Sequence, residues 1–379
     1  MGFQHGVLLG DEIKVRIRDH LLTGLVGEMG VSHFLLLRHA RETDAWLSVE
    51  YREEIAGIAD GAGVSYSQVL LLNTYSDLLA QPWPDHHIQD LILSLSSRFA
   101  PHYGPAIRVH STGPASQERT APATLRGAAS GAFAVFGAAT RDGSLLQAVD
   151  LASPTLSPEE LLIVVYRPEE GNSFLAVGEP GSVGFDVGMN EEELSVTALP
   201  SRSQDASLDG VPLRFLLRDV LQQAGDIPSA LRIIASADRT TGYNVLVGDG
   251  QRPDAQVIEC STHLHAVFEA QGDLVVRTNH FLDSALRQAQ RTLSGWEEED
   301  SWERLDSLQR ALESDHGRLD YSKVIGIIRQ LSGTGDDSQS IEGDSPVLGL
   351  LLGVSDLELR IVSGFEGESG FVIRLNESR

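Results

Sequence analysis

The residue with the clearest capacity for chemistry is Ser130, because a polar segment ends directly before it and a strand pattern begins there. Residues 96–129 are rich in Ser, Pro, Gly, Ala and Thr and carry no hydrophobic periodicity, which predicts a flexible linker. Residues 130–137 have the small and apolar composition of a buried strand. A cut at this junction would give Ser130 a free α-amine, a base beside its hydroxyl nucleophile. The arrangement predicts a chain that cleaves itself and then attacks acyl groups with Ser130.

Cys260 is the alternative nucleophile. It lies within an apolar strand pattern, and no neighbour in the sequence would stabilise its thiolate. We therefore expect Cys260 to be a small buried side chain.

Other common signatures of catalysis or metal binding are absent from the sequence, including Gly-x-Ser-x-Gly, His-Glu-x-x-His and the P-loop. Three pairs of residues have ligand-type side chains without the spacing of a metal site: His86 with His87, His263 with His265, and Asp336 with Asp337. We expect neither a metal nor a cofactor.

The composition restricts the partners of the protein. Its 379 residues include 29 Lys and Arg against 54 Asp and Glu, a formal net charge of −25. Nucleic acids and anionic membranes are bound through Lys and Arg, so we expect neither as a partner. The chemistry assigned to Ser130 calls for a small-molecule acyl amide or thioester, and the sequence is compatible with a homo-oligomer.

The sequence also indicates a cytoplasmic location. A single cysteine excludes an internal disulfide, which agrees with a reducing compartment. No apolar run approaches the roughly 20 residues of a membrane helix, and the N-terminal residues lack the pattern of a signal peptide.

The hydrophobic periodicity predicts an α+β fold in which antiparallel sheets lie between helices. The expected helices cover residues 46–59, 68–79, 213–221, 228–235, 284–294, 300–314 and 321–331. The expected strands cover residues 133–136, 145–149, 161–166, 174–177, 194–199, 244–247, 255–259, 265–268, 274–277, 347–354, 357–362 and 370–375. One integrated domain results, with a helical part over 1–95, the linker over 96–129 and the core over 130–379.

The chain also resembles the acyl-coenzyme A:6-aminopenicillanate acyltransferase family of N-terminal-nucleophile hydrolases. The resemblance rests on the order and spacing of short segments over nearly the whole length. These segments are 2–13, 54–63, 72–73, 133–137, 140–143, 180–181, 188–190, 210–212 with Arg218, 278–280 and 284–287. The resemblance implies an αββα sandwich, two antiparallel sheets between helix layers.

The resemblance also implies self-cleavage between Ala129 and Ser130. Family members cut themselves before a cysteine, usually after a glycine, and that cysteine then attacks an acyl group with its own α-amine as base. Counting back from Gly137 places Ser130 at the cysteine position and Ala129 at the preceding one. Serine serves as N-terminal nucleophile in related superfamilies, and a free α-amine titrates near pH 7.7–8.0, which suits a base.

Further site residues are implied by the same resemblance. Asn279 matches the residue that stabilises the oxyanion. Family members carry Asn or Arg and then Asp on the strand after the first hairpin, where counting gives Val149 and Ala152. Asp150 lies two residues before Ala152 and is our candidate for the missing catalytic carboxylate.

Three residues are expected at the substrate: Asn190, His280 and Arg287. Asn190 is interpreted as either structural or pocket-lining. Arg287 would orient a carboxylate, or would be an ordinary surface arginine of its helix.

Two interpretations of function therefore compete. In the first, Ser130 is a working nucleophile of an amide-bond hydrolase or acyltransferase. In the second, the chain stays uncleaved and the same fold acts as a non-catalytic binding or assembly module. Ala129, Val149 and Ala152 favour the second, whereas Ser130 and Asn279 favour the first.

Overall fold

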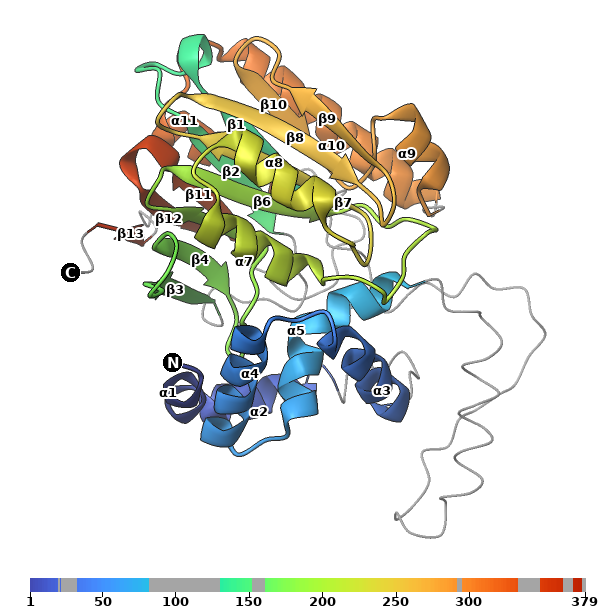
Figure 1. The fold of residues 1–379 in the computed structure, drawn as a ribbon. Helices are drawn as coiled ribbons and strands as arrows, with labels where there is room; N and C mark the ends of the chain where they lie inside the picture. Colours follow the sequence, from blue (N-terminus) through green and yellow to red (C-terminus); the bar gives the residue numbers. More distant parts are fainter. Residues whose placement is uncertain are drawn as a thin grey trace.

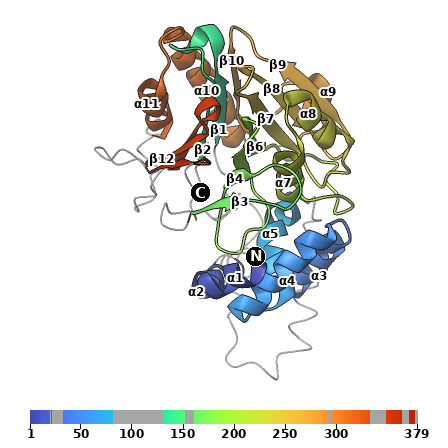
Figure 2. The same ribbon diagram turned by 60° about the vertical axis from the view of Figure 1, so that its left-hand side comes forward.

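The computed structural model describes residues 1–19, 21, 33–81, 130–151, 161–291, 295–332, 348–363 and 371–376. These residues form two antiparallel sheets that face each other, with helices on both outer faces and a group of N-terminal helices at one end (Figure 1). The αββα layering predicted above is confirmed. Figure 2 shows the two sheets between one helix pair on each side.

The six-stranded sheet contains β1, the first strand in the described part of the chain. Its strand order is β10-β1-β2-β11-β12-β13. The bounds are β1 Gly131–Val135, β2 Leu146–Leu151, β10 Leu274–Arg277, β11 Leu348–Gly353, β12 Glu358–Ser363 and β13 Val372–Arg374. Strand β1 alternates cleanly, since Ala132 and Ala134 face the second sheet whereas Phe133 and Val135 face a helix layer.

The seven-stranded sheet follows the chain order β3-β4-β5-β6-β7-β8-β9. Its strands are β3 Leu162–Tyr166, β4 Phe174–Gly178, β5 Val187–Asn190, β6 Leu194–Pro200, β7 Tyr243–Asp249, β8 Asp254–Cys260 and β9 His265–Glu269. Strand β5 is absent from the sequence-based prediction, because its four residues include a glycine and a polar end and give little periodicity.

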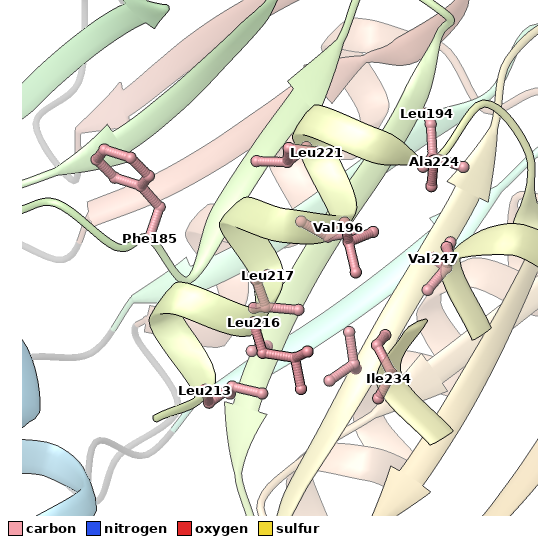
Figure 3. Packing of buried hydrophobic residues seen from close by; sticks show 14 of the residues in the cluster. Phe185, Leu194, Val196, Leu213, Leu216, Leu217, Leu221, Ala224, Ile234 and Val247 are labelled. Carbon is pink, nitrogen blue, oxygen red and sulfur yellow. The ribbon is translucent and has the colours of Figure 1, made fainter. Parts of the chain in front are cut away.

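Each sheet is covered by two helices. Helices α7 (Leu213–Gln223) and α8 (Ile227–Ser236) pack on the seven-stranded sheet, where the leucines of α7 meet Val196 and Val247 (Figure 3). Helices α10 (Gly295–Ser314) and α11 (Tyr321–Ser332) pack on the six-stranded sheet, and the short α9 (Ser284–Ala289) precedes them. The predicted amphipathic helix over 213–221 is confirmed.

The N-terminal helices form a cluster of their own. They are α1 (Gly2–Leu8), α2 (Gly10–Arg16), α3 (His33–Asp44), α4 (Val49–Ala62) and α5 (Tyr66–Ala80). Ser65 caps α5 in a capping box, and Gly63 ends α4 with φ of 67°. Their apolar side chains pack together with Val183 and Phe215 of the core. The predicted linker over 96–129 lies outside the described residues.

Helix α1 contacts α4 at glycines and is absent from the sequence-based prediction. A Cβ at Gly6 would lie 2.2 Å from the Ile58 carbonyl oxygen, and one at Gly61 would lie 2.3 Å from that of Phe3. The two backbones can approach this closely only because glycine fills both positions. A seven-residue helix with a glycine face has no hydrophobic stripe to detect.

A buried ion pair joins the N-terminal helices to the core. The Glu54 carboxylate lies 2.7 Å from Arg218 Nη1, and both side chains are about nine-tenths buried. The hydroxyl of Tyr166 donates to Glu54 at 2.7 Å, and the guanidinium lies 4.3 Å from the centre of the Tyr166 ring.

Glu54→Gln is expected to lower the free energy of unfolding by about 3 kcal/mol, because it leaves the buried Arg218 guanidinium without its counter-charge. Urea unfolding of both proteins measures the difference. Asp11→Asn removes one partner of an exposed pair with Lys14 and should leave stability unchanged. Equal effects of the two substitutions would contradict this account.

Candidate active site

Ser130 lies directly before β1 and is 3% exposed. Strand β1 is antiparallel to β10, with Ala132 opposite Arg277, so the start of β1 lies beside the end of β10. Asn279 follows β10 by two residues, and the Ser130 backbone N–H donates to Asn279 Oδ1 at 2.9 Å. The structure therefore brings together two residues that are 149 positions apart and that the sequence analysis assigns to one site.

The Asn279 amide has two further contacts. Its Nδ2 donates to the Pro200 carbonyl at 3.0 Å, and its Oδ1 also accepts from Arg304 Nη2 at 3.4 Å. Arg304 lies on α10, where its guanidinium also pairs with Asp300 one turn earlier. Arg304 is absent from the residues predicted from the sequence, although its i,i+4 spacing from Asp300 is typical of an ion pair along a helix.

His280 is buried beside Asn279 and is held neutral. Its Nδ1 lies 2.7 Å from Ser301 Oγ, while Nε2 has no hydrogen-bond partner among the described residues. Burial, together with the arginines at 277, 287 and 304, lowers the pKa of His280 to about 4. The imidazole therefore carries no charge at neutral pH.

Arg287 and His280 share a neighbour. The His280 and Trp302 rings lie 3.8 Å apart, and the exposed Arg287 guanidinium is 5.4 Å from the centre of the Trp302 ring. The structure thus brings these two predicted substrate residues into one group around Trp302, which the sequence analysis does not identify.

Asp150 lies next to Ser130 along the sheet but on the other face. It is opposite Gly131, and a Cβ at Gly131 would lie 2.7 Å from Leu308 of α10. By strand alternation, Ser130 continues the face of Ala132, toward the second sheet. The structure therefore turns Asp150 toward the α10 layer, away from the face of the candidate nucleophile.

The Asp150 carboxyl lacks a full set of hydrogen bonds to the described residues. Its Oδ1 is buried without a hydrogen-bond partner among the residues described. Burial raises the pKa of Asp150 to about 7, although the nearby Arg304 guanidinium opposes this shift.

Asp150→Asn is expected to flatten the pH dependence of stability between about pH 4 and pH 7. The folded state keeps a proton on Asp150 up to about pH 7, whereas the unfolded carboxyl loses it near 3.8. The stabilising contribution is complete below the unfolded pKa and falls by on the order of 1 kcal/mol per pH unit until the folded pKa. Urea unfolding at several pH values measures it. A difference between variant and wild type that is constant with pH would contradict this prediction.

Val149 occupies the strand position opposite Ala132. It is fully buried and packs with apolar side chains between the two sheets, among them Leu350 and Val187. An apolar side chain therefore fills the position at which the resemblance expects Asn or Arg.

The Asn190 side chain makes hydrogen bonds within the seven-stranded sheet and to the end of α7. Its Nδ2 donates to the carbonyls of Leu221 and Ala224 at 2.9 and 2.7 Å, and its Oδ1 accepts from the N–H groups of Glu192 and Leu194. These contacts join the end of α7 to the β5–β6 turn. Neither Ser130 nor Asn279 is among its partners, which agrees with the structural interpretation of this residue.

Cys260 is fully buried in the core under α7 and α8. Burial raises the pKa of its thiol to about 11. It is therefore a protonated core side chain at neutral pH, as the sequence analysis expects.

Several candidates lie outside the described residues, namely Ala129, Ala152, His86, His87, Asp336 and Asp337. Within the described part of the chain, no group of three or more His, Cys, Asp or Glu side chains could hold a metal ion. The helices in this part are also too short or too polar to span a membrane.

Solved structures and sequence relatives resemble the chain. A variant of conjugated bile acid hydrolase from Clostridium perfringens aligns with a TM-score of 0.49 and 13% identity, covering 66% of this chain and 93% of its own. Penicillin V acylase from Agrobacterium tumefaciens aligns with a TM-score of 0.40 and 13% identity, covering 65% and 86%.

Among sequence relatives, an uncharacterized protein of Archaeoglobus fulgidus is 26% identical over 358 residues, which cover 85% of this chain and 54% of the relative. Protein dcd1A of Dictyostelium discoideum is 23% identical over 284 residues, which cover 71% and 54%. The chain thus spans about half the length of these relatives.

The family model described as acyl-coenzyme A:6-aminopenicillanic acid acyl-transferase matches residues 142–338. The match begins after Ser130 and β1, and it includes Asp150, Asn279 and Arg304. It covers more than half of the 379 residues. The chain therefore belongs to the acyl-coenzyme A:6-aminopenicillanic acid acyl-transferase family.

Proposed function

We propose that the protein is an amide-bond hydrolase or acyltransferase that uses Ser130 as an N-terminal nucleophile after self-cleavage between Ala129 and Ser130. The observation that carries the proposal is the 2.9 Å hydrogen bond from the Ser130 backbone N–H to Asn279 Oδ1. This nitrogen becomes the α-amine when the chain is cut, so its acceptor is in place before cleavage.

Self-cleavage would begin with attack by Ser130 Oγ on the carbonyl carbon of Ala129. The new Oγ–C ester bond replaces the C–N bond, and the hydroxyl proton passes to the departing nitrogen of Ser130. Water then hydrolyses the ester, which leaves Ala129 with a carboxylate and Ser130 with its hydroxyl and a free amine.

In turnover, the free α-amine would take the hydroxyl proton as Oγ attacks the substrate carbonyl. Its charged form would be disfavoured by the Arg304 guanidinium, which contacts the same Asn279 oxygen. Asn279 Nδ2 would donate to the oxyanion that develops on the acyl group. Its present contact with the Pro200 carbonyl occupies one of its two hydrogens.

The substrate is a small acyl amide or thioester, and the acyl group passes to water or to another nucleophile. The group formed by His280, Trp302 and Arg287 is the candidate substrate surface, since it adjoins Asn279 and exposes a guanidinium. Arg287 at this position suits a carboxylate on the substrate. No cofactor takes part in these steps.

One observation favours the second candidate function, an uncleaved binding or assembly module. Val149 is fully buried between the sheets, on the face that Ser130 continues. An apolar side chain therefore occupies the position for which the resemblance implies Asn or Arg.

Labelling with p-nitrophenyl acetate separates the two candidates. An enzyme should carry the acetyl group on Ser130 under single-turnover conditions, and peptide mass analysis locates it. Acetyl on exposed lysines alone, with Ser130 unmodified, would favour the module. Ser130→Ala provides the background for non-specific acetylation.

A further inference from the structure

The loop that presents Asn279 is held by side chains from two strands, one helix and the residue after α9. The loop comprises residues 278–283, between β10 and α9. Its backbone groups bond to Asn244 of β7, Glu259 of β8, Gln290 after α9 and Ser301 of α10. We infer that this cradle, and Asn244 in particular, positions the Asn279 amide relative to Ser130. The inference rests on the proposed function, which gives Asn279 its role.

Asn244 makes hydrogen bonds to the loop on both sides of Asn279. Its Nδ2 donates to the Thr278 carbonyl and to the His280 carbonyl, each at 2.8 Å. Two donations from one atom require an NH₂ group, which a carboxylate cannot supply. Asn244 is fully buried, and its Oδ1 has no hydrogen-bond partner among the described residues. The Asn244 side chain therefore holds the loop through the two hydrogen bonds that it donates.

Glu259 fixes the far end of the loop. Its Oε2 accepts from the N–H groups of Leu282 and Asp283 at 2.8 and 2.9 Å, while Oε1 pairs with Arg277 at 2.8 Å. Arg277 is the last residue of β10, so one buried carboxylate ties the strand end to the loop end.

The remaining contacts complete the cradle. Ser301 Oγ accepts from the Asn279 N–H at 3.1 Å, and Gln290 Oε1 accepts from the Phe281 N–H at 3.0 Å. Small displacements of a positioned donor can cost about 100-fold in rate. The position of the Asn279 amide therefore depends on Asn244, Glu259, Gln290 and Ser301. None of the hydrogen bonds given above joins these four residues to Ser130.

Asn244→Asp tests the inference, with Asn73→Asp as the matched control. Asn73 is also fully buried and donates Nδ2 to two carbonyls, those of Val69 and Gly181, but these belong to other elements. Asn244→Asp should slow self-cleavage and lower kcat for p-nitrophenyl acetate by roughly tenfold or more, with KM within about twofold. Asn73→Asp should keep both rates, per folded molecule, within about twofold of wild type.

Unchanged rates in Asn244→Asp, or equal losses in both variants, would overturn the inference. If Asn244→Asp does not fold, Gln290→Ala decides: a lower kcat at unchanged KM supports the cradle, and wild-type kinetics overturn it. If the wild-type chain neither cleaves itself nor turns over, the proposed function fails instead. In that case, hydrogen exchange tests whether Asn244 holds the loop. The backbone amides of residues 278–283 should exchange faster in Asn244→Asp than in Asn73→Asp, and equal exchange would overturn the inference.

Discussion

Ser130→Ala is expected to abolish acyl turnover and to leave the fold intact. The substitution removes one oxygen from a side chain that is 3% exposed, so packing changes little. It removes the proposed attacking atom, and loss of the nucleophile lowers kcat by at least about 10³-fold in serine hydrolases. Release of p-nitrophenol from p-nitrophenyl acetate, corrected for the rate in buffer, measures the effect.

A matched control distinguishes loss of chemistry from loss of structure. Ser195→Ala removes the same oxygen from a fully buried serine of β6, whose hydroxyl contacts Gln147. It should retain turnover. Ser130→Cys should supply another nucleophile at the same position, because a cysteine thiol can also attack an acyl group. Turnover by Ser130→Ala at the wild-type rate would refute the assignment of Ser130.

Asn279→Asp is expected to lower kcat by about 10²–10³-fold. The substitution keeps an oxygen that can accept from the Ser130 N–H and from Arg304, but it removes the Nδ2 donor. It also adds a negative charge next to the α-amine that self-cleavage would free. This charge should raise the pKa of the amine and move the acid limb of the kcat/KM profile to higher pH.

Asn279→Leu provides the comparison. This substitution removes the donor and the acceptor together, so both self-cleavage and turnover should slow. Asn279→Asp keeps the acceptor, so it should slow self-cleavage less than it slows turnover. A pH profile that does not move in Asn279→Asp, together with kcat within about twofold of wild type, would contradict the role given to this amide.

The sequence predicts the layers of this fold well, and two of the candidate residues that it names, Ser130 and Asn279, are in contact in the structure. The helix over 213–221 and most strands have strong periodic patterns, and these elements are confirmed. The resemblance names both residues, Asn279 within segment 278–280 and Ser130 by counting back from Gly137. Neighbouring β1 and β10 then bring these segments together.

The remaining features depend on tertiary structure. Arg304 reaches Asn279 only because α10 crosses the six-stranded sheet beside β10 and β1, and no local pattern predicts that crossing. The face of Asp150 is set by the register of β2 against β1, and a shift of one residue would reverse it. Asn244 on β7 and Glu259 on β8 both contact the loop after β10, and the spacing of these residues along the chain cannot predict such contacts.

The most direct test of the central claim is the intact mass of the purified protein under denaturing conditions, for wild type and Ser130→Ala. Self-cleavage predicts two fragments in the wild type, one of which begins at Ser130, and a single 41.0 kDa chain in the variant. A wild-type chain that stays whole at 41.0 kDa would contradict the claim and would favour the uncleaved module.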